Sequence, residues 1–178
     1  MSVYGGKEMA AAFRTVRRNT IQIAEEIPED KYDFVPATGV KSVGKTLVHM
    51  AISPSIWPEL AKEGLTTLVG YDFLNLRERI GAEEAKPRTK AELLELLRSE
   101  GEKHAAWLES LTPEFLAVEV IDGDGKTLKS RFERVLGGKE HEMHHRGQLM
   151  LVQRMLGITP HLTRQGEERL KQLRAAKA

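Results

Sequence analysis

The stretch SRFERVLGGKEHEMHHRGQLMLVQRML, residues 130–156, decides how this chain is expected to fold. Its apolar residues recur at the three- and four-residue spacing of a long amphipathic helix, and Ser130 is a good N-cap. Gly157 and Pro160 follow it and predict its end. Within the helix, His141 and His145 stand four residues apart. Both imidazoles therefore project from one face and can reach a single metal ion.

Three further segments have helical periodicity; they cover about residues 7–27, 42–58 and 89–111. Ser42 is expected to cap the second helix, which Pro54 kinks or shortens and Pro58 ends. Thr89 followed by Glu92 has the pattern of a capping box for the third. Four long helices without alternating β units predict an all-α protein, a four-helix bundle.

The remaining segments are expected to be minor. Residues 59–86 are mixed in pattern and predict no more than a helical turn or two. Residues 117–129 contain two short alternating runs around Gly123–Gly125, which predict a small hairpin or extended excursion before the last long helix. Residues 163–175 form an amphipathic segment that predicts a short final helix.

Composition narrows the classes of function. A chain of 178 residues fits one domain, and 40% hydrophobic with 30% charged residues is typical of a globular protein. The formal net charge of +1 gives no reason to expect a nucleic-acid partner. The chain has no cysteine, so a disulfide, a cysteine-ligated zinc site and a protein thiol nucleophile are excluded.

The location of the protein is expected to be cytoplasmic. The N-terminal stretch MSVYGGKEMAAAFRTVRRNTIQ lacks the apolar core of a signal peptide. No segment approaches 18 consecutive apolar residues, so no membrane partner is expected either.

A third histidine completes a candidate metal site. His49 lies in the second predicted helix, and Ile52 and Ile56 share its face, so its ring is expected to point into the bundle. A buried histidine on one helix and a buried pair on another are what a three-histidine site requires. We therefore predict that His49, His141 and His145 bind one divalent ion. Zinc, nickel, ferrous iron and manganese all suit three imidazoles.

The other polar residues near this face receive separate predictions. Gln148 follows His145 on the ligand face and is the candidate catalytic residue, because it could hydrogen-bond a water or substrate at the metal. His144 falls about 60° from His141 and is expected at the surface or an interface. His104 and His161 have charged or proline neighbours and are expected at the surface.

Residues 141–145 also spell H-E-x-x-H, the zinc metalloprotease signature. The context does not support a peptidase. Gly147 comes one residue too early for the extended form of the motif, and no third histidine follows at its spacing. Glu142 lies about 100° from His141 on the helical wheel, where it is expected to pair with Arg146.

Three segments together resemble a known family. They are SVGKTLVHMA at residues 42–51, LTPEF at 111–115 with DGDGKT at 122–127, and EHEMHHRGQ at 140–148 with RMLG at 154–157. In these segments the chain resembles the DinB-like superfamily, which includes the YfiT-like proteins. The resemblance implies one up-down-down-up bundle domain over residues 1–178, homodimer formation, and metal ligation by His49, His141 and His145.

The resemblance also implies chemistry, with alternatives. Better-understood relatives are metal-dependent transferases that join a low-molecular-weight thiol, such as bacillithiol or mycothiol, to a small electrophile. A metal-dependent hydrolase or isomerase of a small molecule is the first alternative, and a non-enzymatic metal-binding dimeric scaffold is the second. A second apolar stripe on the last long helix comprises Leu136, Met143, Gly147 and Met150. Either a second subunit covers this stripe, which the resemblance favours, or a fifth helix of the same chain covers it.

Overall fold

The structure, a computed structural model, describes residues 4–62 and 64–177. Its helices are α1 (Gly6–Glu26), α2 (Val43–Ile52), α3 (Ile56–Leu60), α4 (Phe73–Glu84), α5 (Lys90–Glu109), α6 (Pro113–Ala117), α7 (Arg131–Met155) and α8 (His161–Ala175). Two 3₁₀ turns, η1 (Glu29–Lys31) and η2 (Ser53–Ser55), and two strands, β1 (Glu119–Ile121) and β2 (Leu128–Ser130), complete the chain.

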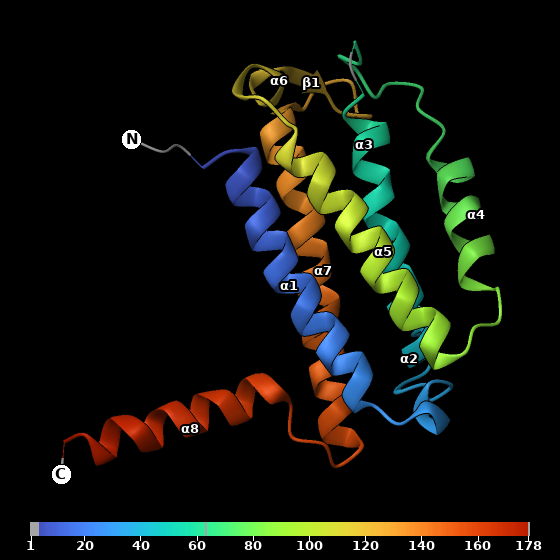
Figure 1. Ribbon diagram of the computed structural model, residues 1–178. Helices are drawn as coiled ribbons and strands as arrows, with labels where there is room; N and C mark the ends of the chain where they lie inside the picture. Colours follow the sequence, from blue (N-terminus) through green and yellow to red (C-terminus); the bar gives the residue numbers. More distant parts are fainter. Residues whose placement is uncertain (1–3, 63, 178) are drawn as a thin grey trace.

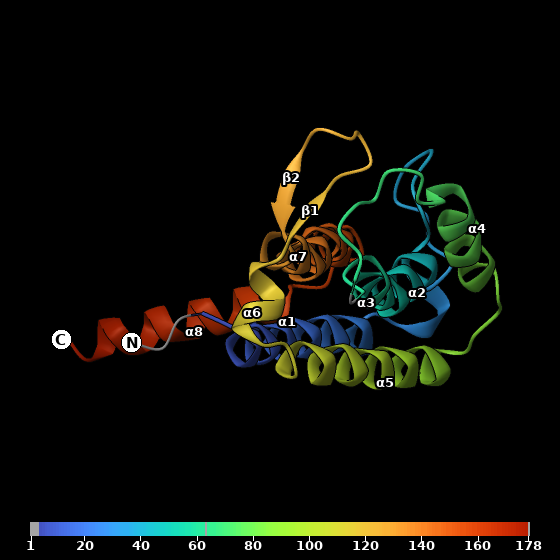
Figure 2. The same ribbon diagram turned by 90° about the horizontal axis from the view of Figure 1, so that it is seen from above.

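Four helices form the bundle (Figure 1). Helices α1 and α7 run in one direction, and α2, continued by α3, and α5 run in the other, so the order is up-down-down-up. Seen from above in Figure 2, α1 packs against α5 and α7, and α2 packs against the same two helices from the opposite corner. The predicted four-helix bundle is confirmed. Since α2 and α5 are parallel, the chain must cross the length of the bundle between them, and α4 lies in this crossover.

Helix starts follow the predicted caps. The Ser42 hydroxyl accepts a hydrogen bond from the Lys45 amide, and capping boxes open α5 at Thr89 and α7 at Ser130. The expectation that Pro58 ends the second helix is wrong, because Pro58 lies inside α3. It occupies the first turn of that short helix, where a backbone N–H has no partner within the helix and its loss is tolerated.

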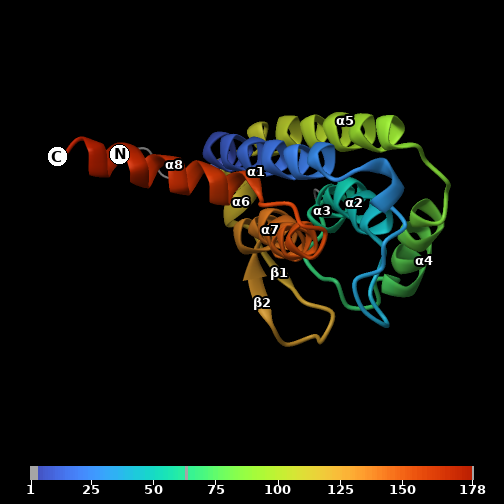
Figure 3. The same ribbon diagram turned by 90° about the horizontal axis from the view of Figure 1, so that it is seen from below.

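The segments outside the bundle differ in how well the sequence predicted them. The hairpin forms, with Val120 opposite Lys129, and Gly125 in its turn has a positive φ of 69°. Residues 59–86 hold more helix than expected, since α4 has three turns and is capped by Asp72. Helix α8 extends away from the bundle with Leu170 and Leu173 exposed (Figure 3). Within the described ranges, no helix is long and apolar enough to cross a membrane.

A buried ion pair joins all four bundle helices. Arg17 of α1 and Glu142 of α7 are 3% and 1% exposed, and the Arg17 Nε lies 2.8 Å from the Glu142 Oε1. The same guanidinium donates to the carbonyl oxygens of Leu97 in α5 at 2.8 Å and Met50 in α2 at 2.7 Å. The prediction that Glu142 pairs with Arg146 is wrong, since Glu142 pairs with Arg17. The wheel showed Arg146 one turn away, but it could not show that α1 places a cation on the buried side.

We expect Glu142→Leu to lower the free energy of unfolding by about 3–5 kcal/mol, because it leaves the Arg17 charge buried without its partner. The double variant Arg17→Met/Glu142→Leu should recover part of the loss, although the Leu97 and Met50 carbonyls then lose their donor. Urea unfolding followed by circular dichroism measures each value. Glu140→Leu, at an exposed position of the same helix, is the control and should change the value by less than about 0.5 kcal/mol.

His104 is also buried, contrary to prediction. It is 4% exposed, and its ring lies 4.7 Å from that of Phe13 and 5.4 Å from that of Trp107, centroid to centroid. The charged neighbours at 102 and 103 suggested a surface position, but the spacing from Leu97 through Gly101 to His104 is that of the buried stripe of α5. His161 is likewise buried, at 1% exposed, at the start of α8.

The burial of His104 makes stability depend on pH. Burial, with a smaller contribution from the Arg17 charge, lowers the pKa of His104 from 6.5 to about 4. Between these values the unfolded chain binds the proton more readily, so the free energy of unfolding should fall as pH drops from 6.5 to 4. In His104→Leu the fall should be shallower, by at most about 3 kcal/mol at pH 4. Urea unfolding of both proteins across this pH range tests the prediction. The same dependence of the unfolding free energy on pH in His104→Leu and in the parent would contradict it. His144→Leu, at an exposed site, is the control.

Candidate metal centre

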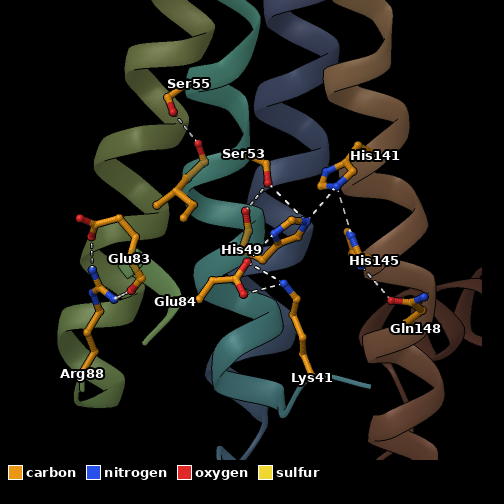
Figure 4. A network of polar contacts seen from close by, with 11 residues as sticks. Lys41, His49, Ser53, Ser55, Glu83, Glu84, Arg88, His141, His145 and Gln148 are labelled. Carbon is orange, nitrogen blue, oxygen red and sulfur yellow. Dashed lines mark hydrogen bonds and ion pairs between the residues drawn. The ribbon is translucent and has the colours of Figure 1, made fainter. Parts of the chain in front are cut away.

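Three imidazoles converge between α2 and α7 (Figure 4). The Nε2 atom of His141 lies 3.0 Å from the Nε2 of His49 and 3.2 Å from the Nε2 of His145. One ligand atom of each ring can be chosen so that all three lie within 4.8 Å of one another. All three side chains are half-buried. The structure thus brings together the three residues that the sequence singled out.

The backbone that carries these rings is fixed by the buried ion pair. Arg17 binds the carbonyl of Met50, the residue after His49, and the carboxylate of Glu142, the residue after His141. One guanidinium therefore holds α2 and α7 at the two positions next to the imidazoles. Glu142 is fully engaged in that contact, so its carboxylate is not free to act as the base of a metalloprotease.

Glu84, the last residue of α4, holds the outer side of His49. Its Oε1 accepts a hydrogen bond of 2.8 Å from the His49 Nδ1, and Lys41 binds the same carboxylate at 2.5 Å. The sequence reasoning missed Glu84, because residues 59–86 were expected to hold little helix. No spacing in the sequence links position 84 to position 49, so the contact depends on how α4 packs against α2.

Gln148 holds the outer side of His145. Its Oε1 accepts a 2.8 Å hydrogen bond from the His145 Nδ1, and its Nε2 donates to the His144 Nε2 at 3.1 Å. The sequence predicted Gln148 as a group that contacts water or substrate. The structure instead gives it two histidine partners, and a substrate contact stays a prediction.

These outer contacts determine which nitrogens face inward. A carboxylate and an amide oxygen can only accept, so the Nδ1 atoms of His49 and His145 carry their protons. In the neutral rings both Nε2 atoms then present lone pairs toward the His141 Nε2. One proton on His141 could bridge to only one of them, which leaves another lone pair unmatched. A divalent cation would satisfy all three, so the donor set fits a metal ion.

The protonation states favour the same conclusion. Burial, then the neighbouring His145 and His49 charges, lowers the pKa of His141 to about 4. Burial also lowers the pKa of His49, against the opposing hydrogen bond to Glu84, and the pKa of His145. Neutral imidazoles are the form that binds metals.

Two cavities are each lined by one histidine of the ring cluster. One, here called the apolar pocket, has a volume of about 440 Å³ between residues 36–46 and the α7 face from His145 to Met155. The other, the charged pocket, has about 480 Å³ and is lined by Lys41, His49, Arg77 and Glu84 among others. Lys41 lines both. A larger depression of about 660 Å³ lies over α1 and α5, and none of the three histidines lines it.

Comparison with known proteins decides the family. Residues 12–149 match the family model described as the DinB superfamily. The chain belongs to the DinB superfamily. The uncharacterised protein YjoA of Bacillus subtilis is 30% identical over 159 residues, which cover 85% of this chain and 91% of YjoA.

Two solved structures share the fold. The crystal structure of the DinB-like protein YjoA from B. subtilis superimposes with a TM-score of 0.64 at 26% identity, covering 85% of this chain and 93% of that one. YfiT from B. subtilis gives 0.67 at 19% identity, covering 89% and 91%. YfiT is described as a probable metal-dependent hydrolase with an unusual four-helix bundle topology. At this identity the likeness to YfiT shows the fold alone.

We expect the untagged protein to bind one zinc ion, and His49→Ala, His141→Ala and His145→Ala each to weaken binding by more than roughly 100-fold, because each removes one of three donors. Competition with a chelating dye measures the affinity. His144→Ala is the matched control and should retain the ion. Equal affinity of His49→Ala and the parent would refute the three-histidine site. Glu84→Ala should lower the metal affinity roughly 10- to 100-fold, because it removes the hydrogen bond that holds the His49 ring. Glu83→Ala is its control and should change the affinity little.

Proposed function

We propose that this DinB-superfamily protein is a metal-dependent transferase that joins a low-molecular-weight thiol to a small electrophile, with a divalent ion on His49, His141 and His145. One observation carries the proposal: two cavities reach the three-histidine cluster, since His145 lines one and His49 lines the other. Two cavities that each include a residue of one cluster suit a reaction of two substrates.

The chain supplies positioning, and the two reactants come from solution. When bound, a divalent ion with three neutral ligands supplies Lewis acidity, which favours the thiolate form of a thiol. Glu84 and Gln148 hold the His49 and His145 rings with their Nε2 atoms inward. In the transfer, the carbon–sulfur bond forms as the bond from that carbon to its leaving group breaks. The thiol proton passes to solvent, because Glu84, the carboxylate that contacts the cluster, is already paired with Lys41 and accepts from His49.

A hydrolase is the second candidate, and a specific finding favours it. YfiT, which shares the fold, is described as a probable metal-dependent hydrolase. The same cluster could activate water instead of a thiol. A hydrolase needs one organic substrate, however, and would leave the second cavity without a role.

A thiol panel separates the two candidates. With zinc, nickel, ferrous or manganese ion added, we expect turnover of an electrophile such as N-butyl-2-chloroacetamide to require one of cysteine, glutathione, coenzyme A, bacillithiol or mycothiol. His141→Ala should lower kcat/KM by at least about 100-fold, because the electrostatic activation of the nucleophile is lost. Chloride release and thioether formation are measured together. Chloride release at the same rate without thiol would indicate a hydrolase. If no chloride were released with any of the metals, whether or not a thiol was present, the result would contradict both the transferase and the hydrolase.

A homodimer and a cytoplasmic location are part of the same proposal. Of the predicted dimer stripe on α7, Met143 and Gly147 are exposed, whereas Leu136 and Met150 are half-buried against the core. The exposed leucines of the projecting α8 add apolar surface that a second copy could cover.

A further inference from the structure

The two cavities beside the histidines differ in chemistry. The apolar pocket is walled by Val40 and Val43 on one side and by Leu151 and Met155 of α7 on the other. Lys41 is the one fully charged side chain among its described lining residues, and its ammonium is paired with Glu84. The pocket therefore offers an uncharged surface, which favours an uncharged, apolar ligand.

The walls of this pocket are unusually exposed for apolar residues. Val40, Leu151 and Met155 are 49%, 60% and 53% exposed, and they gather around one cavity whose end is formed by His145. A ligand that covers them would gain the free energy of burying apolar surface. The volume of about 440 Å³ lies in the range of small-molecule sites.

The apolar pocket runs along α7, so a ligand in it would have one end at the histidine cluster. His145 and Met155 are ten residues apart on one helix, a rise of about 15 Å. A ligand lying along this face has one end at the ring cluster and the other beside Met155. The charged pocket, which His49 lines, contains Arg77, which is exposed and has no carboxylate partner among the described residues. That side suits a hydrophilic reactant bearing a carboxylate.

We propose that the apolar pocket binds the electrophile, with an alkyl or aryl body along α7 and its reactive carbon at the His145 end, and that Leu151 and Met155 set its selectivity. The thiol then approaches from the charged pocket. This assignment rests on the proposed transferase function and adds the substrate class and its orientation. The reaction is a displacement: the carbon–sulfur bond forms, the carbon–chlorine bond of the probe breaks, chloride leaves, and the thiol proton goes to solvent.

The kinetic test uses N-methyl-, N-butyl- and N-octyl-2-chloroacetamide with the most active thiol of the panel. From the methyl to the butyl probe, kcat/KM should rise about 30- to 60-fold, since each of the added methylenes is worth a factor of about three to four when buried. In Leu151→Gln/Met155→Gln the rise from the methyl to the butyl probe should be below about threefold. Leu170→Gln/Leu173→Gln removes an equally exposed leucine pair on α8 and should keep the parent's rise.

A binding test separates failure of the pocket from failure of the transferase. The inert analogue N-butylacetamide is titrated into the zinc-loaded protein while methyl resonances are followed by NMR. We expect shifts at Met155 and Leu151 but not at Leu170 or Leu173. If no thiol supports turnover yet these shifts occur, the pocket assignment survives without the transferase. Thiol-dependent turnover with no dependence on chain length, or equal dependence in the pocket variant, overturns the assignment, as does the absence of shifts.

Discussion

The rest of this structure depends on the contacts that the buried guanidinium of Arg17 makes. It lies in the interior of the bundle, yet it binds one group from each of the other three bundle helices: the carboxylate of Glu142 and the carbonyls of Leu97 and Met50. A buried charge costs several kcal/mol unless it is paired and its donors are satisfied. A helix that slid or rotated would take its group out of reach of Arg17, so the buried ion pair disfavours such alternative packings. Gly101 of α5 leaves the necessary room, because a Cβ there would lie 2.8 Å from the Arg17 Cγ.

The same contact explains why the histidines meet. Both groups that Arg17 binds on α2 and α7 are next in sequence to a candidate ligand, so the inward face of the ring cluster inherits the rigidity of the core. The outward face has different support: Glu84 comes from α4 and Gln148 from an exposed position of α7. A rigid inner layer and a separately supplied outer layer allow the reactivity of the centre to change without loss of the fold.

Sequence reasoning succeeded where a signal is local and periodic. The caps at Ser42, Thr89 and Ser130, the long helices and the inward facing of the three histidines all follow from spacing along one helix. It failed where the deciding partner lies far away in the chain. No residue near Glu142 in the sequence indicates that it pairs with Arg17, 125 residues earlier. His104 was predicted at the surface from its charged neighbours, although its spacing belongs to the buried stripe of α5. Position 84 could not be linked to position 49, because the apolar residues of α4 have only a weak amphipathic pattern. The sequence therefore does not show that α4 packs against α2.

The same division explains why the candidate metal site is easier to infer than its reaction. A three-imidazole site needs only two helices in fixed register, which the sequence encodes through apolar periodicity and the buried ion pair. Under the proposed function, the identity of the substrates depends on what surrounds the cluster: residues 36–46, the exposed end of α7, and α4. These segments carry few core residues, so folding constrains them weakly and they are free to differ between proteins that share the bundle. Lys41 stands at their junction, lining both cavities while it neutralises Glu84. Function is therefore best sought at this junction, where one side chain touches both candidate substrate sites and, through Glu84, the histidine cluster.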